Sequence, residues 1–421
     1  MNKPPLRIIF LDNLRCFFVL CVVMEHACHA YRGPGWWPVI DGNPSLPVQF
    51  LSAFFDSFTM PLLFFISGYF AIPSMEKKGS GAFISAKLRR LGIPWLVCIL
   101  TICPVLPLIY HYTRNGFMRT QSYGEIWLEI AKNALSIHIG IIGSMNDLMI
   151  ENRFYQRYMW FLSLLILFFI IFAVIFHFRK RYFIREITPV RKSAPTVCRT
   201  LKLFITVGSL TSFFSFGTFG LIMAFGPETS DSEPLFSFFN IIQFRPSRIF
   251  FFIIYFIMGI LSYRNKWIAG GKFPGHLKTW SVLFALLLSV LLTTKYLMIP
   301  GPGKYRELYE PIYFLFLNFL TISALGFFSS LALRYWNRPN AFNREMAAHS
   351  YNIYLSHYLF VIALQLFLVT VPGLPGIMKF FIVSASAVAL SFCASRFLLK
   401  PFPKLSVAAA FGLLFTMLII F

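Results

Sequence analysis

The chain is 421 residues long; 57% of its residues are hydrophobic, 13% are charged and 52 are phenylalanine. A soluble domain is about half apolar and a quarter charged, so this composition excludes a soluble globular protein and indicates a fold surrounded by lipid. The net charge of +22 does not indicate a nucleic-acid partner, because the basic residues lie in short loops between apolar runs and form no basic arm.

Apolar runs recur along the whole chain, and a run of about 20 residues is long enough to cross a bilayer as a helix. Ten segments qualify: 8–31, 50–73, 91–113, 158–178, 203–225, 247–263, 279–298, 309–333, 351–371 and 376–399. An eleventh, 405–421, fits a span or an interfacial helix equally well. The sequence therefore predicts an all-α polytopic membrane protein with ten or eleven transmembrane helices in one domain, 1–421, and no appended soluble domain.

The basic residues predict an orientation for these spans. Of the 38 Lys and Arg, 25 lie in the N-terminal segment and the alternate loops on its side, and 11 lie in the other loops. Because short cytoplasmic loops are enriched in Lys and Arg, this bias predicts a cytoplasmic N-terminus. In the longest outer loop, 114–157, the apolar stretch 134–142 is too short to span, and we expect it to be re-entrant or interfacial. The inner loop 179–192 is expected to be a solvated basic segment facing lipid.

The first span contains five titratable residues: Asp12, Arg15, Glu25, His26 and His29. Eleven residues turn a helix by about 1100°, so Arg15 and His26 share a face and lie about 16 Å apart along the axis. Asp12 is placed to pair with Arg15 one turn away. A structural ion pair at the inner interface, with the histidines near the outer one, would explain this pattern. An ionisable residue in a span nevertheless costs at least about 2.5 kcal/mol and usually faces a cavity, which favours a functional role.

The residue types narrow that role. A histidine is suited to remove a proton from a hydroxyl group, and an arginine is suited to bind a phosphate or a carboxylate. In the predicted orientation, Arg15 presents a cation toward the cytoplasm and His26 presents a base toward the outside. This polarity suits a reaction between an anionic donor on the inside and an acceptor on the outside.

Short motifs along the chain resemble those of the membrane acyltransferase-3 family. In chain order they are LDNLR at 11–15, Arg15-x10-His26, MPLLFFISGYF at 60–70, KLRRLGIPW at 87–95, YMWFL at 158–162 and SYNIYLSH at 350–357. The segments 60–70, 87–95 and 350–357 resemble most the subgroup that succinylates periplasmic glucans. Lys87 departs from the family by occupying the first position of an R-x-x-R pattern, where it keeps the charge but loses two-point phosphate binding.

The resemblance implies transfer of an acyl group, acetyl or succinyl, from acyl-coenzyme A to a hydroxyl of a cell-envelope glycan or lipid-linked sugar. It also implies a multi-pass protein of the bacterial cytoplasmic (inner) membrane, with His26 as general base and Arg15 as its essential partner. Acyl-coenzyme A is expected as a substrate, with no bound cofactor. The seven cysteines form no CxxC pair, so we expect neither a metal site nor a disulfide framework.

Further residues receive supporting roles. We expect Asp12 and Glu25 to support the arginine and the histidine beside them. The hypothesis for Lys87, Arg89 and Arg90 is that they hold the donor phosphates at the inner end of the third span.

Roles for three other residues in the matching motifs follow from their positions. His357, in the first two turns of the span 351–371, is placed near the donor side and suits a structural or a functional role. Gly68 is expected to allow close helix packing. Trp160 suits an interfacial anchor better than the wall of a tunnel.

Two other protein classes remain open at this point. A transporter or flippase of a sugar or lipid-linked substrate would show interrupted spans in matching halves. Met60-Pro61 and Ile93-Pro94 could mark such breaks, but the second half has no corresponding pair. A scaffolding membrane protein predicts no buried ionisable pair.

Overall fold

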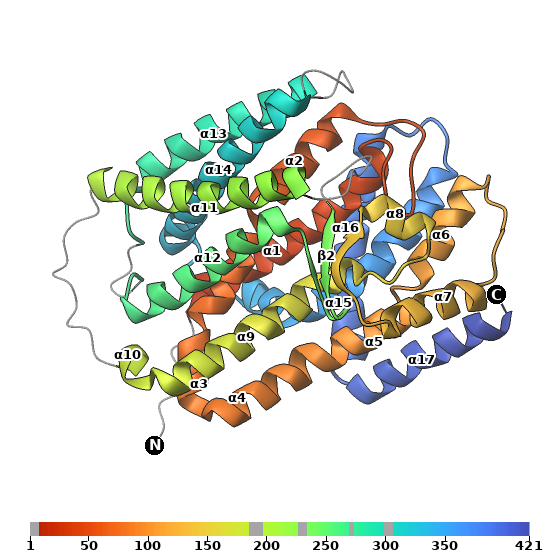
Figure 1. Ribbon diagram of the computed structural model, residues 1–421, viewed down its shortest axis with the longest axis horizontal. Helices are drawn as coiled ribbons and strands as arrows, with labels where there is room; N and C mark the ends of the chain where they lie inside the picture. Colours follow the sequence, from red (N-terminus) through yellow and green to blue (C-terminus); the bar gives the residue numbers. More distant parts are fainter. Residues whose placement is uncertain (1–7, 185–196, 226–233, 269–272, 299–305, 421) are drawn as a thin grey trace.

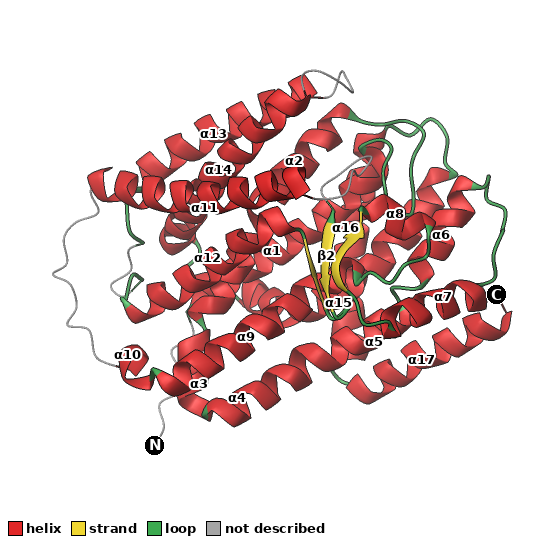
Figure 2. Cartoon of the chain, viewed as in Figure 1, coloured by secondary structure: helices red, strands yellow, loops and turns green. Residues whose placement is uncertain are grey.

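The computed structural model describes residues 8–184, 197–225, 234–268, 273–298 and 306–420, and most of them lie in helices (Figures 1 and 2). The elements of the first part of the chain are α1 (Ile9–Cys28), η1 (His29–Tyr31), α2 (Leu46–Tyr69), α3 (Ala71–Lys78), α4 (Ser80–Lys87), the π-helical turn η2 (Leu88–Gly92), α5 (Ile93–Thr101), α6 (Val105–Arg114), α7 (Tyr123–Leu135), β1 (Ile139–Gly143), α8 (Met145–Ile150), η3 (Arg157–Met159), α9 (Trp160–Phe178) and α10 (Lys180–Ile184). Those of the second part are α11 (Val197–Phe225), β2 (Leu235–Phe238), β3 (Ile242–Phe244), α12 (Pro246–Arg264), α13 (Leu277–Met298), α14 (Arg306–Tyr335), α15 (Ala341–Val369), α16 (Gly376–Ala394), the π-helical turn η4 (Ser395–Leu399) and α17 (Pro403–Ile420).

Ten helical segments of the described chain are long and apolar enough to cross a membrane, which confirms the predicted polytopic helical fold. They include Pro403–Ile420, the segment that the sequence left undecided. The first helix is not among the ten, because Asp12, Arg15 and Glu25 all fall within its 20 residues. It lies inside the bundle instead, packed against α2, α14, α15 and α16. The bundle thus buries most of the side-chain surface of Asp12, Arg15 and Glu25, as charged residues within a membrane require.

The bundle has a dense centre around α1 and α2. Phe18, Phe58 and Phe328 come from α1, α2 and α14, and their ring centroids lie 5.0 to 6.2 Å apart. The closest helix approach is between α2 and α12, where a Cβ on Gly68 would lie 2.1 Å from the carbonyl oxygen of Phe256, and one on Gly259 would lie 2.0 Å from that of Phe65. The prediction that Gly68 permits close packing is confirmed.

One end of the bundle carries a small antiparallel sheet in the order β1-β2-β3 (Figure 2). The stretch 134–142 ends α7 and forms most of β1, and its predicted re-entrant or interfacial position stays a prediction. Its isoleucines favour an extended chain, and its backbone groups pair with β2, which lies about a hundred residues later in the chain. We call this end of the bundle the sheet end. Both η3–α9 and α12 start there, because β3 leads directly into α12.

The predicted basic loop 179–192 is only partly visible. Its first residues form α10, which follows α9 directly, and residues 185–192 lie outside the described residues. At Pro61, where a broken span was considered, α2 continues without interruption.

Candidate active site

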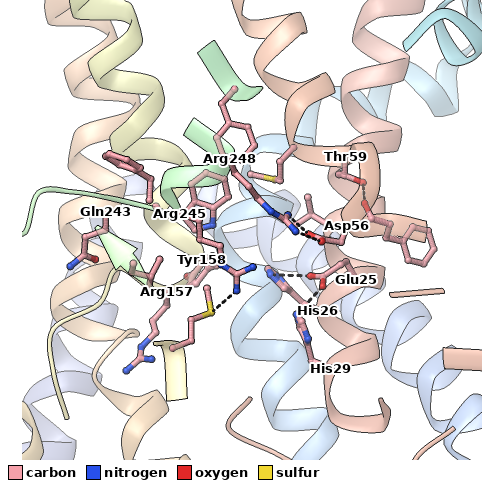
Figure 3. Close-up of a pocket in the computed structure, with 18 of the residues that line it drawn as sticks. Glu25, His26, His29, Asp56, Thr59, Arg157, Tyr158, Gln243, Arg245 and Arg248 are labelled. Atoms are coloured by element: carbon pink, nitrogen blue, oxygen red, sulfur yellow. Dashed lines mark hydrogen bonds and ion pairs between the residues drawn. The ribbon is translucent and has the colours of Figure 1, made fainter. Parts of the chain in front are cut away.

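A cavity of about 240 Å³ lies near the sheet end, among α1, α2, α9, α12 and α15 (Figure 3). Its charged lining residues are Glu25, Arg32, Asp56, Arg157, Arg245 and Arg248. Arginines outnumber carboxylates in this set, so the cavity is suited to hold an anionic group. A second cavity, of about 740 Å³, adjoins it. The residues that line both cavities are Arg32, Trp36, Asp56 and Arg245.

His26 is held in this cavity by a histidine of α15. His26 Nδ1 lies 2.9 Å from His357 Nε2, and His357 Nδ1 lies 2.7 Å from the carbonyl oxygen of Tyr354. A carbonyl only accepts hydrogen bonds, so His357 Nδ1 carries the hydrogen and His357 Nε2 of the neutral ring accepts. His26 Nδ1 must then donate, which leaves the lone pair of its neutral ring on Nε2. This chain of hydrogen bonds makes His26 Nε2 a base at the edge of the cavity.

Glu25 lies between the two histidines of α1. Its Oε1 is 2.9 Å from His29 Nε2, whereas its Oε2 is 3.5 Å from His26 Nε2. The first distance is that of a hydrogen bond donated by His29, and the second is too long for one. Glu25 therefore leaves the lone pair of His26 Nε2 available. Once His26 has taken a proton, the nearby negative charge of Glu25 stabilises the imidazolium.

Glu25, His26 and His29 also form the group of potential metal ligands found among the described residues. Ligand atoms of Glu25, His26 and His29 all lie within 4.8 Å of one another. In the structure, Glu25 Oε1 and His29 Nε2 are 2.9 Å apart and form a hydrogen bond with each other. The expectation that the site uses no metal stays a prediction.

A buried hydrogen-bond chain fixes the end of α1. The side-chain amide of Gln365 donates to the carbonyl oxygens of His26 and Ala27 at 3.3 and 3.2 Å, and the indole N–H of Trp37 donates to Gln365 Oε1 at 2.7 Å. The Trp37 ring also stacks on His29, with centroids 4.4 Å apart. These contacts occupy carbonyls that a helix end leaves unsatisfied, and they hold both histidines in place.

Several other polar groups of the cavity are paired or neutral. Asp56 of α2 receives two hydrogen bonds from the guanidinium of Arg248 on α12, at 3.1 and 3.0 Å. Burial raises the pKa of Tyr155, beside the start of α9, to about 12, so its hydroxyl is uncharged at neutral pH. Burial lowers the pKa of Arg32, in the loop after α1, while the charges of Glu25 and Asp56 oppose that shift.

Arg15 lies at the other end of α1, outside this cavity. Its guanidinium is 3.2 Å from Asp12 and donates to the carbonyl oxygen of Ala347 on α15 at 3.4 Å. His26 and Arg15 therefore both contact α15, which agrees with the predicted common face of α1. Eleven residues separate them, or about 16 Å along the helix.

Arg90 meets the same part of α15 as Arg15. Its guanidinium lies over the ring of Tyr351, 5.3 Å from the centroid, and the Tyr351 hydroxyl donates to its carbonyl oxygen. Tyr351 is one turn beyond Ala347, so the structure brings Arg90 and Arg15 to neighbouring turns of one helix. We call this region the basic end of the bundle.

Lys87 and Arg89, the other two predicted donor-binding residues, contact groups outside α15. Lys87 Nζ lies over the ring of Phe169 of α9, 3.8 Å from its centroid. Arg89 is exposed and donates to Ser85 Oγ at 3.1 Å. Arg89 and Arg90 lie within η2 and Lys87 directly precedes it. Among the described side-chain contacts of these three residues, only that of Arg90 reaches α15.

Two predicted placements are wrong. α15 begins at Ala341, ten residues before the predicted span, because the polar run AFNREMAAHS reads as a loop by hydropathy alone. His357 consequently lies beside His26 and not near the donor side. Trp160 lines the cavity, so the tunnel-wall interpretation holds for it in place of the interfacial anchor.

Sequence reasoning missed Asp56, Arg157, Arg245 and Arg248, which contribute most of the charge around His26. We used the arginines only to orient the chain. In the predicted orientation, Arg245 and Arg248 lie at the start of a span on the side where the positive-inside rule disfavours basic residues. That local exception was the available signal that they serve the site.

Comparisons with known proteins identify the family of the chain. A family described as "Acyltransferase domain" matches residues 8–396. Curated relatives named "Glucans biosynthesis protein C" from Escherichia coli strains SMS-3-5 / SECEC and O1:K1 / APEC are each 32% identical over 100 residues. That match covers 24% of this chain and 26% of each relative, so the chain spans about a quarter of the length of the proteins it resembles. No solved structure matches the chain.

Proposed function

The chain belongs to the acyltransferase-3 family, and on that premise we propose that it moves an acetyl or succinyl group from acyl-coenzyme A to a hydroxyl of a cell-envelope glycan or lipid-linked sugar. It is a multi-pass integral membrane acyltransferase. The proposal concerns the donor, the acceptor and the residues that carry the reaction.

The hydrogen-bond chain from Tyr354 through His357 to His26 is the observation that carries this proposal. It leaves His26 Nε2 unprotonated beside a cavity wide enough for small substrate groups. A general base must hold an accepting atom within reach of the hydroxyl that it deprotonates. His26 then takes the proton of the acceptor hydroxyl, and Glu25 stabilises the resulting imidazolium.

The donor is assigned to the basic end. Arg15 and Arg90 contact neighbouring turns of α15; Arg89 lies in the same π-helical turn as Arg90, and Lys87 directly precedes that turn. Guanidinium groups bind phosphates through two parallel hydrogen bonds. The phosphates of coenzyme A are therefore proposed to rest there, while its flexible arm carries the thioester along the bundle toward His26.

The acceptor and the cellular setting are proposed from the relatives and from the charge of the loops. A relative named for glucan biosynthesis favours a glucan-like acceptor, and the larger cavity adjoins the His26 cavity on a polar, aromatic wall. The excess of Lys and Arg in alternate loops favours a cytoplasmic N-terminus in a bacterial inner membrane, with the sheet end outside.

The test is acyl transfer by the purified protein. Labelled acetyl- or succinyl-coenzyme A is supplied with periplasmic glucan, and the label is followed into the glycan by mass spectrometry. We expect transfer by the wild type and none above background by His26→Ala. Unchanged transfer by His26→Ala would overturn the mechanism. Movement of unmodified glycan across vesicles without acylation would favour the transporter alternative.

A further inference from the structure

Arg245 differs from the other arginines of the His26 cavity. Figure 3 shows its guanidinium directed toward His26 and Glu25, with a hydrogen bond to the sulfur of Met145. That contact is 3.6 Å long, and thioether sulfur is a weak acceptor. Its Nε is buried and has no hydrogen-bond partner among the described residues. A guanidinium with an unpaired buried donor retains hydrogen-bonding capacity for a ligand.

The neighbouring arginines have stronger protein partners. Arg248 donates twice to Asp56. Arg114, in the wall of the larger cavity, donates to the carbonyl oxygens of Gly35 and Trp37 at 2.7 and 2.9 Å. Those contacts assign Arg248 and Arg114 to holding the fold. Arg157 also has a buried nitrogen without a partner among the described residues, but Figure 3 shows its side chain directed away from His26 and Glu25. Arg245 is therefore the labelled arginine whose guanidinium faces the reacting group beside His26.

The position of Arg245 also fits a reacting centre. Its side chain lines both the His26 cavity and the larger adjoining cavity. An acceptor that enters through the larger cavity must pass Arg245 to bring its hydroxyl to His26 Nε2. The thioester carbonyl that this hydroxyl attacks would then lie between the base and the guanidinium.

The sheet end holds Arg245 rigidly. Arg245 directly follows β3, and the completely buried Gln243 of that strand donates to the carbonyl oxygen of Phe154 at 3.2 Å. Gln243 Oε1 accepts from the backbone N–H of Gln156 at 2.9 Å. These bonds tie β3 to the start of α9, so the backbone that carries Arg245 is fixed before substrate binds.

We propose that Arg245 stabilises the oxyanion that forms during acyl transfer, an inference that rests on the proposed function. His26 Nε2 takes the acceptor proton as the acceptor oxygen bonds to the thioester carbon. The carbonyl π electrons move to its oxygen, which becomes an oxyanion and accepts hydrogen bonds from Arg245. The oxyanion then re-forms the carbonyl and breaks the C–S bond. The thiolate leaves with the electron pair and takes the proton from the His26 imidazolium, which yields the ester and free coenzyme A.

The competing assignment for Arg245 is a contact with a carboxylate at the far end of the acyl group. The two assignments predict different donor dependence. A carbonyl oxygen is present in every acyl donor, whereas only a dicarboxylic acyl group carries the distal carboxylate. Acetyl- and succinyl-coenzyme A therefore separate them.

The experiment compares Arg245→Gln and Arg245→Lys with wild type on both donors. We expect Arg245→Gln to lower kcat by about 10²–10³-fold for every donor that the wild type uses, with little change in the donor KM. Arg245→Lys should recover part of that loss because it restores the charge. The matched control is Arg153→Gln, since Arg153 is 49% exposed, pairs with Glu151 and lies outside both cavities.

Each outcome has one meaning. A loss confined to succinyl-coenzyme A, or kcat unchanged in Arg245→Gln, would overturn the oxyanion assignment. Gel filtration and thermal unfolding in detergent identify a misfolded variant, and Arg245→Lys then carries the test. Wild-type protein that transfers neither acyl group would contradict the proposed function itself, whereas active wild type with active Arg245→Gln contradicts only this inference.

Discussion

The two ends of α1 hold the two residues that the sequence singled out, and they are built differently. His26 is 15% exposed, and the carbonyl behind His357 settles which of its nitrogens carries hydrogen. Arg15 is 35% exposed and contacts Asp12 and one carbonyl oxygen at 3.4 Å. The fixed hydrogen-bond partners of His26 keep its ring in one geometry, as a residue that takes part in catalysis requires. A long side chain at a half-exposed position adjusts to what binds there, which suits capture of a flexible donor.

The largest expected effect comes from removing the base at the sheet end. His26→Ala should lower kcat by about 10²–10⁴-fold, the usual contribution of a general base. His29→Gln is the matched control, because glutamine still donates a hydrogen bond to Glu25, and we expect its kcat to stay within about tenfold of wild type. Steady-state transfer rates with labelled donor measure both. Equal losses in the two variants would mean that the chemistry is not localised at His26.

The next largest effect concerns the partner of His26. His357→Phe removes the acceptor for His26 Nδ1 and leaves a buried donor unsatisfied, so we expect kcat to fall by about 10–100-fold with the donor KM unchanged. His357→Gln offers a carbonyl oxygen as acceptor and should recover much of the rate. If both variants lose activity equally, His357 acts through packing and does not orient His26.

The sequence was informative where chemistry depends on one helix. The spacing of Arg15 and His26, the pairing of Asp12 with Arg15 and the position of His26 toward one end of α1 all follow from helix geometry. The polytopic fold followed from span length and composition. Gly68 was read correctly because small residues mark close helix contacts in membranes.

The rest depended on contacts between segments far apart in the chain. His357 was misplaced because the polar start of α15 hides a continuous helix, and 331 residues separate it from His26. The sheet was missed because β1 pairs with a strand about a hundred residues away, and short apolar runs fit a strand or a helix equally well. Arg245 depends on that sheet for its position, so the residue proposed to act opposite His26 could not be found from local pattern alone.

At the basic end, the expected defect is in binding and not in kcat. Arg15→Gln should raise the KM for acyl-coenzyme A by about 10–100-fold, the value of a charge-assisted hydrogen bond to a phosphate. Arg15→Lys should fall between this variant and wild type. The measurement is donor KM with coenzyme A thioesters and with thioesters lacking the 3′-phosphate. A fall in kcat at saturating donor would instead place Arg15 in the chemical step and erase the distinction between the two ends.

The smallest expected effect separates the basic residues around η2. Arg90 contacts the turn of α15 next to the one that Arg15 reaches, whereas Arg89 is exposed and bonded to Ser85. Removing an exposed charge changes an interaction by at most about 1 kcal/mol, or roughly fivefold. We therefore expect Arg90→Gln to raise the donor KM by about fivefold and Arg89→Gln by less than about twofold. Titration of donor at two salt concentrations measures both. A larger change in Arg89→Gln would move the donor phosphates to the face of Ser85, away from α15, and Arg15 would then lie too far from them to share their binding.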